Sequence, residues 1–228
     1  METFLKYNVY FVSIYVLLRP NFKQKMDEKL KLILRESSYL FLKYGVRSLS
    51  MDDLCREMGI SKKTLYQYVE NKSDLITKTL DFIVTDNVAA LGEANNSGFN
   101  AIDQLLIVSR KVCIEMQHFN PSISFDMQKY YPEIYRRFNH TKKEVIFNQI
   151  VENMRRGINE GLYRNDLPVE LVARLYVQKL EYINDPEFLQ SDDFSFTNMF
   201  QVMFDNHIRG ISNAKGLEYY EQRLTSKQ

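Results

Sequence analysis

Apolar residues recur along most of this chain at the 3.6-residue spacing of amphipathic helices. The first such stretch covers residues 27–44 and ends at Gly45, a residue that tolerates the left-handed conformation common after helices. Residues 91–100 form a polar, glycine-containing break, and the polar tail from Asn213 onward is expected to be a frayed helical end. Further helices are expected to begin near Asn71 and to cover residues 101–119, 133–160, 169–183 and 194–211. Because no segment alternates like a strand, the pattern predicts an all-α protein.

Two short helices are predicted between residues 50 and 69. Ser50 is a good N-cap, and the two aspartates that follow it place negative charge at the positive end of the first helix. The apolar stripe of this helix consists of Met51, Leu54, Cys55 and Met58. Gly59 then suits a turn, and Ser61 can cap a second helix that runs through Val69. Two short helices joined by a three-residue turn with glycine are typical of a helix-turn-helix.

The outward face of the second helix is rich in groups that bind nucleic acid. It carries Lys62, Lys63, Thr64, Tyr66, Gln67 and Tyr68. Lysine binds phosphate, hydroxyl groups donate to it, and glutamine can pair with the edge of an adenine. An ordinary solvated corner of an all-α protein would show the same pattern, so the residues leave both interpretations open.

Several motifs in this region also occur in the order and at the spacing of a known family. They are Ser50-Met-Asp-Asp-Leu, Met58-Gly-Ile-Ser, Thr64-Leu-Tyr and Val69-Glu-Asn-Lys-Ser-Asp-Leu. Residues 27–87 thereby resemble the headpiece of the tetracycline-repressor (TetR) family of bacterial regulators. The chain departs from the family pattern in small ways. Val69 stands where an aromatic residue is usual in the family, and Tyr68 stands where His or Tyr is common.

The resemblance implies a three-helix DNA-binding headpiece at residues 27–87, with its helix-turn-helix at about 50–69. A helical ligand-binding and dimerisation body would occupy residues 88–228. A homodimer would bind a pseudo-palindromic operator in double-stranded DNA. The expected DNA contacts are Ser50, Ser61, Lys62, Lys63, Thr64, Tyr66, Gln67, Tyr68 and Lys72.

The charge distribution agrees with a local attraction to phosphate. The net charge of the chain is only +1, but residues 23–72 hold 11 Lys/Arg against 7 Asp/Glu, which is +4 and leaves −3 for the remainder. Hydrophobic residues at 45% and charged residues at 26% indicate a folded protein. The two cysteines, Cys55 and Cys113, cannot form a disulfide framework, so a reducing cytoplasm is the expected location. The DNA binding that the resemblance implies would place the protein at the nucleoid.

Aromatic and methionine residues gather in the middle of the predicted body. They are Met116, Phe119, Phe125, Met127, Tyr130, Tyr131, Phe138 and Phe147. Each could be plain core, but together they could line a cavity for a small apolar or weakly polar effector. The resemblance implies a ligand pocket in this region.

The last two predicted helices are apolar along one side, which indicates an interface or an internal core. In the TetR family the corresponding helices form a four-helix dimer seam. The expected interface residues are Leu171, Leu175, Phe196, Phe200, Met203 and Phe204. A monomer could bury the same side chains internally.

Residues 1–26 precede the predicted headpiece as an extension. Residues 9–18 are almost entirely apolar, yet they fall short of the ~20 residues that a membrane-spanning helix needs. Three interpretations are open: an added helix or arm, a weak membrane contact, or translation from an upstream start codon. We favour the last, because Met26 stands immediately before a complete first helix.

The sequence contains no complete catalytic motif and no complete set of metal ligands. Glu115 and His118 have the spacing of a di-iron ligand pair, but such a site needs a second copy of this motif, and that copy is missing. No G-x-S-x-G motif or phosphate-binding loop occurs. We therefore expect no enzyme, metal or cofactor, and predict a sequence-specific transcriptional regulator. Its expected mode is repression relieved by a lipophilic ligand, and the alternative is a ligand-independent or partner-controlled DNA-binding protein of the same fold.

Overall fold

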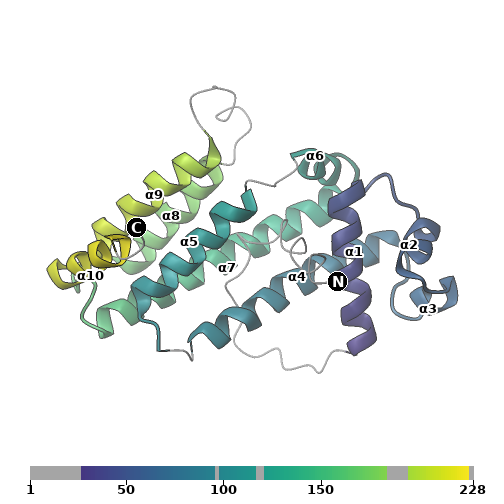
Figure 1. The fold of residues 1–228 in the computed structure, drawn as a ribbon. Coiled ribbons are helices and arrows are strands. Elements are labelled where there is room, and N and C mark those ends of the chain that lie inside the picture. Colours follow the sequence, from purple (N-terminus) through teal and green to yellow (C-terminus); the bar gives the residue numbers. More distant parts are fainter. Residues whose placement is uncertain (1–26, 96–97, 117–120, 184–194, 226–228) are drawn as a thin grey trace. The chain divides into compact units, whose positions relative to one another are not determined.

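A computed structural model describes residues 27–95, 98–116, 121–183 and 195–225, so the N-terminal extension, His118 and Phe119 lie outside the described residues. The described residues form ten α-helices and no strand, which confirms the predicted all-α class (Figure 1). The helices are α1 Glu28–Tyr44, α2 Met51–Met58, α3 Lys62–Tyr66, α4 Lys72–Asn95, α5 Ala101–Met116, α6 Pro121–Tyr130, α7 Pro132–Asn159, α8 Val169–Tyr182, α9 Phe196–Ile211 and α10 Ala214–Thr225. None of these helices is long and apolar enough to cross a membrane.

Most helix limits agree with the sequence pattern, but three differ. Helix α3 ends at Tyr66 rather than Val69, because the backbone N–H groups of Gln67 and Tyr68 bond three residues back and tighten the chain into a turn. Helix α4 continues to Asn95, into the expected break. The tail after Asn213 is not frayed: it forms α10, in which Tyr220 is buried.

The chain divides into two compact units. The N-terminal unit contains the described parts of residues 1–89 and 118–142, and the C-terminal unit contains those of 90–117 and 143–228. Helix α6 and the first turns of α7 thus belong with α1, α2 and α3, although the sequence-based domain limits assign them to the body. Helices α4 and α7 each contribute residues to both units.

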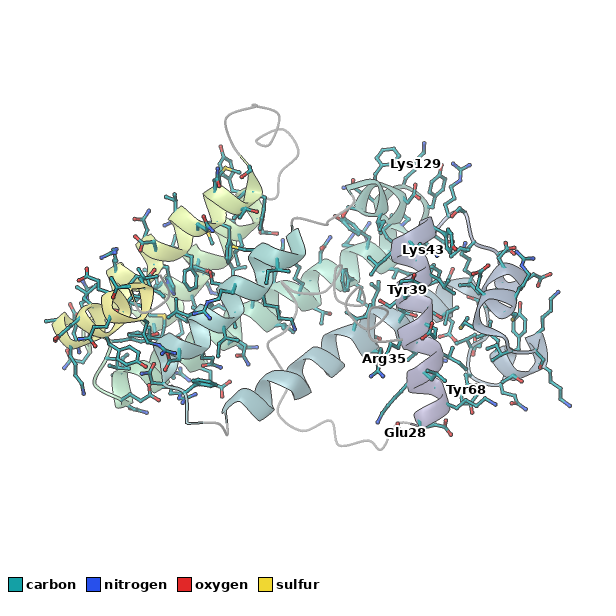
Figure 2. The ribbon with its side chains drawn as sticks, viewed as in Figure 1. Glu28, Arg35, Tyr39, Lys43, Tyr68 and Lys129 are labelled. Carbon is teal, nitrogen blue, oxygen red and sulfur yellow. The ribbon has the colours of Figure 1, made fainter. Side chains whose placement is uncertain are left out.

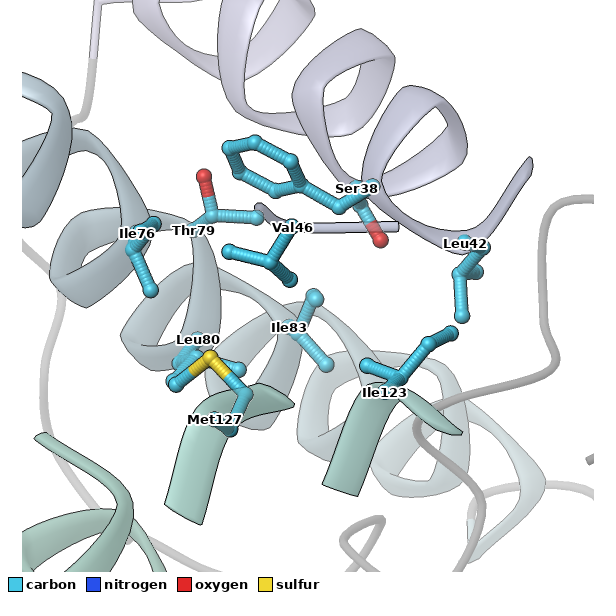
Figure 3. A pocket seen from close by; sticks show the side chains of 10 residues that line it. Ser38, Leu42, Val46, Ile76, Thr79, Leu80, Ile83, Ile123 and Met127 are labelled. Carbon is cyan, nitrogen blue, oxygen red and sulfur yellow. The ribbon is translucent and has the colours of Figure 1, made fainter. Parts of the chain in front are cut away.

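The N-terminal unit has a core of fully buried aliphatic side chains, among them Leu34, Leu54, Leu65 and Leu75. Beside this core lies a cavity of ≈ 20 Å³ lined by side chains of α1, α4 and α6, including Thr79 (Figure 3). The hydroxyl of Thr79 is buried and has no hydrogen-bond partner among the described residues. The cavity is large enough for about one water molecule.

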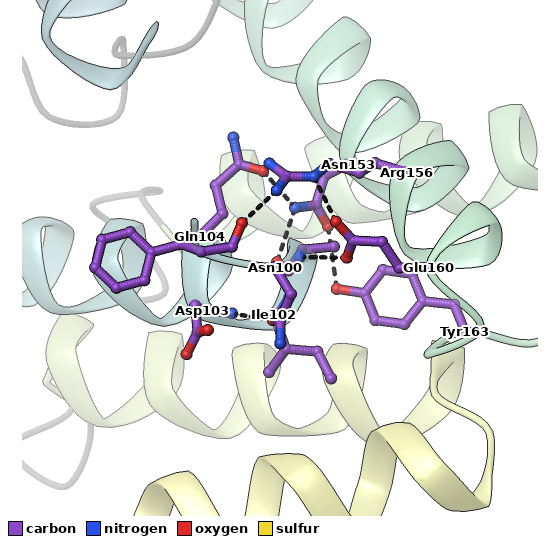
Figure 4. Close-up of polar contacts among 10 residues, drawn as sticks. Asn100, Ile102, Asp103, Gln104, Asn153, Arg156, Glu160 and Tyr163 are labelled. Carbon is purple, nitrogen blue, oxygen red and sulfur yellow. Dashed lines mark hydrogen bonds and ion pairs between the residues drawn. The ribbon is translucent and has the colours of Figure 1, made fainter. Parts of the chain in front are cut away.

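A buried polar network joins α5 to the end of α7 in the C-terminal unit (Figure 4). The Asn153 amide donates to the carbonyl of Ala101 (2.9 Å) and to the side chain of Gln104 (2.8 Å). The carboxylate of Glu160 accepts from the backbone N–H of Ala101 at 2.8 Å, and the hydroxyl of Tyr163 donates to Asn153 at 3.2 Å. Burial raises the pKa of Tyr163, which therefore remains a neutral donor.

Helix α10 is fixed to the same unit by charge and close packing. The buried carboxylate of Asp103 accepts from the Tyr219 hydroxyl at 2.6 Å and from Arg223 Nε at 2.7 Å. A Cβ atom at Gly216 would lie 2.0 Å from the carbonyl oxygen of Leu162. These contacts explain why a polar tail is helical rather than frayed.

Candidate nucleic-acid interface

Helix α2 begins with a complete capping box. The backbone N–H of Asp53 donates to Ser50 Oγ (3.1 Å), and the backbone N–H and hydroxyl of Ser50 donate to the Asp53 carboxylate at 3.0 and 2.6 Å. These bonds, followed by one from Arg56, lower the pKa of Asp53 to about 2. Ser50 therefore has a structural role in addition to any contact with DNA.

The turn between α2 and α3 has the geometry of a helix-turn-helix. Gly59 adopts the left-handed conformation (φ 64°), and its N–H donates to the carbonyl of Arg56 at 3.2 Å. Ser61 then caps α3, because its Oγ accepts from the N–H of Thr64 at 3.0 Å. The fully buried side chains of Leu54 and Leu65 pack the two helices against the core of the unit. The outer face of α3 is thereby presented to solvent.

The structure shows that the predicted DNA contacts differ in how accessible they are. Ser50, Ser61, Lys62, Lys63, Tyr66 and Gln67 are exposed, whereas Thr64, Tyr68 and Lys72 are half-buried. All nine belong to the N-terminal unit. They lie at the start of α2, on α3 or its N-cap, in the turn at Gln67 and Tyr68 that follows α3, or at the start of α4.

Some of these side chains already have partners within the protein. Lys62 pairs with Asp52 at 2.7 Å, and the Tyr68 hydroxyl donates to Asp27 at 3.5 Å. Lys72 Nζ donates to the carbonyl of Arg47 at 3.4 Å, and burial lowers the pKa of Lys72. The side chains of Lys63 and Gln67 make no hydrogen bond or ion pair with the described residues. We therefore expect Lys63 and Gln67 to contribute most directly to an intermolecular contact.

Sequence reasoning missed basic residues near this face. Arg47 lies in the loop before Ser50, and its guanidinium stacks 4.5 Å from the ring of Tyr130. Its position three residues before a predicted N-cap could have drawn attention to it. The placement of Lys129 near the same loop depends on the packing of α6, for which the linear sequence carries no signal.

The predicted ligand-binding residues are dispersed. Met127 and Phe138 are buried in the N-terminal unit, where Phe125 and Tyr130 are exposed and Tyr131 is half-buried. Phe147 belongs to the C-terminal unit, with the guanidinium of Arg174 at 4.6 Å from its ring. Phe119 and the side chain of Met116 are not described. Among the described members in the N-terminal unit, Met127 lines the cavity of ≈ 20 Å³ between α1, α4 and α6.

The predicted dimer residues fall into two groups. Phe196, Phe200, Met203 and Phe204 are buried within the single chain, and the ring centroids of Phe200 lie 5.7 and 6.0 Å from those of Phe196 and Phe204. Leu171 and Leu175 on α8 are instead 58% and 55% exposed. Tyr182 and Val202 are exposed on α8 and α9 respectively. An apolar surface therefore remains on these helices after the chain has folded.

Among the described residues no group of three or more His, Cys, Asp and Glu side chains could hold a metal ion. Glu115 and His118, the candidate ligand pair, are not covered by that statement, because His118 lies outside the described residues.

Comparisons with known proteins agree with this geometry. Residues 33–78 match the sequence profile of bacterial regulatory proteins of the tetR family. The chain is 23% identical over 190 residues to an uncharacterized HTH-type transcriptional regulator, YvaF of Bacillus subtilis, covering 80% of this chain and 95% of that protein.

Solved structures show the same fold. A transcriptional regulator from Cytophaga hutchinsonii aligns with a TM-score of 0.67 at 17% identity, over 82% of this chain and 100% of that one. The fatty acid degradation regulator FadR from Bacillus halodurans aligns with a TM-score of 0.58 at 14% identity, over 81% and 96%. The likeness extends across both units.

Proposed function

The chain is a DNA-binding regulator with the helix-turn-helix headpiece of the tetR family, and from this premise we propose that it is a homodimeric transcriptional repressor. The observation that carries the proposal is the capped pair α2–α3, which presents Lys63 and Gln67 without partners among the described residues. We propose that it acts in the cytoplasm, where a bacterial chromosome is accessible.

DNA binding would use two copies of this headpiece. Two recognition helices about 34–36 Å apart can enter successive major grooves on one face of a duplex, which requires a pseudo-palindromic operator. In each copy, Lys63 would neutralise a phosphate, supported by Lys62 and Lys72. Gln67, at the C-cap of α3, would meet a base edge together with Thr64 on the helix itself.

Release would follow if a small molecule bound the DNA-incompetent arrangement more tightly than the DNA-bound one. Such a ligand shifts the population and lowers operator affinity by the ratio of its two affinities. The apolar and tyrosine side chains predicted to bind it favour a lipophilic, weakly polar effector. Ligand-independent regulation is the second candidate, because the cavity that Met127 lines, at ≈ 20 Å³, holds no more than about one water molecule. A lipophilic compound that both raises the melting temperature of the protein and releases it from DNA would support ligand-released repression over ligand-independent regulation.

The DNA contacts can be tested with the full chain. A duplex selected by the protein from a randomised library serves as the operator, and its affinity is measured at several salt concentrations. Lys63→Ala should weaken all sequences alike and lower the salt slope by about 1, because one phosphate contact is lost. Gln67→Ala should instead relax base preference at particular positions, at a cost of about 1–3 kcal/mol.

Lys215→Ala supplies the control, because Lys215 is an exposed lysine on α10 in the other unit. It should change neither the slope nor the base preference. If Lys63→Ala and Gln67→Ala behaved like Lys215→Ala, α3 would not be the recognition helix.

A further inference from the structure

A second group of cations lies in the N-terminal unit outside α3. It consists of Lys43 at the end of α1, Arg47 in the following loop and Lys129 on α6, together with Tyr39, Tyr44, Phe125 and Tyr130. We refer to these seven residues as the α1–α6 patch. Figure 2 shows Tyr39 and Lys43 along α1 and Lys129 at α6.

Each cation of the α1–α6 patch lies over an aromatic ring. Lys43 Nζ is 5.7 Å from the ring centroid of Tyr39 and 4.8 Å from that of Tyr44. Lys129 Nζ is 5.4 Å from the ring centroid of Phe125 and 5.5 Å from that of Tyr130. The guanidinium of Arg47 also lies over the Tyr130 ring. Phe125 is 59% exposed, and Tyr44 and Tyr130 are exposed as well. The rings support the cations at the surface. Hydrogen bonds with the hydroxyl groups of Tyr44 and Tyr39 also raise the pKa of Lys43, which keeps its positive charge.

The charge of the patch is not neutralised within the protein. Several other cations of the N-terminal unit pair with carboxylates, namely Lys31, Arg56, Lys62, Lys78, Arg136 and Arg137. Lys43, Arg47 and Lys129 form no ion pair with the described residues. The carboxylate of Asp126 lies near Gly45 in this region, but it forms no ion pair with these three cations. The patch is therefore complementary to a polyanion.

The patch is also continuous with the proposed DNA face. Lys72, at the start of α4, donates to the carbonyl of Arg47 at 3.4 Å, and Arg47 precedes the α2 cap Ser50 by three residues. Lysine, arginine and tyrosine hydroxyl groups all bind phosphate oxygens in protein–DNA complexes. We propose that the α1–α6 patch binds the phosphate backbone of duplex DNA flanking each operator half-site, beyond the bases that α3 contacts.

This inference rests on the proposed function, and flank length tests it separately. The operator duplex selected by the full chain is prepared as the minimal core and as the core with about ten further base pairs, one helical turn, on each side. The unmodified protein should bind the longer duplex more tightly and with a steeper salt slope. The variant Lys43→Gln/Lys129→Gln should lose about 2 in slope per protomer on the longer duplex, about 1 for each lost phosphate contact.

On the core duplex the double variant should match the unmodified protein in affinity and base preference. Lys215→Gln should leave both duplexes unchanged, and circular-dichroism melting should show that all variants fold. A double variant that behaves like Lys215→Gln on both lengths, or that weakens both lengths equally, would overturn the flank contact while leaving operator binding intact. Unchanged slopes together with patch-dependent binding of a poly-glutamate peptide would overturn it in favour of an acidic protein partner. Failure to select any operator would refute the proposed function itself.

Discussion

The imidazole of His207 lies in the C-terminal unit against the ring of Tyr176, with the two ring centroids 4.4 Å apart. Its Nε2 atom is buried and has no hydrogen-bond partner among the described residues. Burial, and secondarily the charge of Lys179, lower the pKa of His207 to about 4. Because the ordinary value is about 6.5, protonation favours the unfolded chain.

This pKa makes the free energy of unfolding depend on pH. The stabilisation from neutral His207 should be complete above about pH 6.5 and should be lost as pH falls toward about 4, by about 3 kcal/mol in total. His207→Phe keeps a ring against Tyr176 but cannot titrate, so it should remove this pH dependence. Urea unfolding at a series of pH values measures the effect.

The exposed His140 provides a matched control, since His140→Phe should leave the pH dependence between 6.5 and 4 as it is. Equal pH profiles for the unmodified protein and His207→Phe would show that this imidazole does not control the acid sensitivity.

Single residues also show where sequence reasoning ends. Ser50 and Gly59 were recognisable because caps and left-handed turns depend on neighbours a few residues away. Lys62 and Lys63 look equivalent in the sequence, yet Lys62 pairs with Asp52, which the turn at Gly59 brings close. The sequence identified the candidate contacts on α3 but not which of them already had partners.

At the scale of elements, α10 depends on close packing against the turn after α7. Gly216→Ala would place a Cβ against the carbonyl of Leu162 and should destabilise the protein by about 1–3 kcal/mol through overpacking. Gly210, within α9, has no atom within 4 Å of the position its Cβ would take. Gly210→Ala should therefore stabilise by about 0.5–1 kcal/mol, since alanine is the better helix former.

Chemical denaturation of both variants checks this prediction. The same substitution in two helical glycines is expected to change stability in opposite directions. A loss of similar size in both would mean that close approach to Leu162 is not what restricts position 216.

The helices predicted with least difficulty were those with strong apolar periodicity. The limits of α1 and α7 agree with the pattern to within about one residue. The sequence after Asn213 is polar, and its helix depends on Arg223 and Tyr219 binding Asp103 more than 100 residues earlier in the chain. Contacts at such separation have no signature in local periodicity, which is why α10 was missed.

At the scale of the whole molecule, the exposed leucines of α8 provide a test of dimerisation. Leu175→Glu adds a charge to a surface that would be desolvated between two copies, so the variant should be monomeric at concentrations where the unmodified protein is a dimer. Because Leu175 is exposed in the single chain, the monomer should keep its fold. Sedimentation and circular dichroism together measure both properties.

Ile114→Glu is a suitable control, because Ile114 is an equally exposed apolar residue on a different helix, α5. It should remain dimeric. Phe200→Glu would not serve, since Phe200 is only 3% exposed within its own chain and the charge would disrupt the core. A dimeric Leu175→Glu protein would place the interface on another surface.

The exposure of Leu171 and Leu175, in contrast to the burial of the α9 rings, has a consequence for how dimers of the proposed kind diverge. After gene duplication, the two protein products must stop forming mixed dimers before each can respond to a different effector. Substitutions at exposed positions change partner preference with little effect on folding, because they remove no buried packing from the single chain. We therefore expect new pairing specificities to arise at these leucines, while Phe200 and its neighbours keep the chain folded throughout.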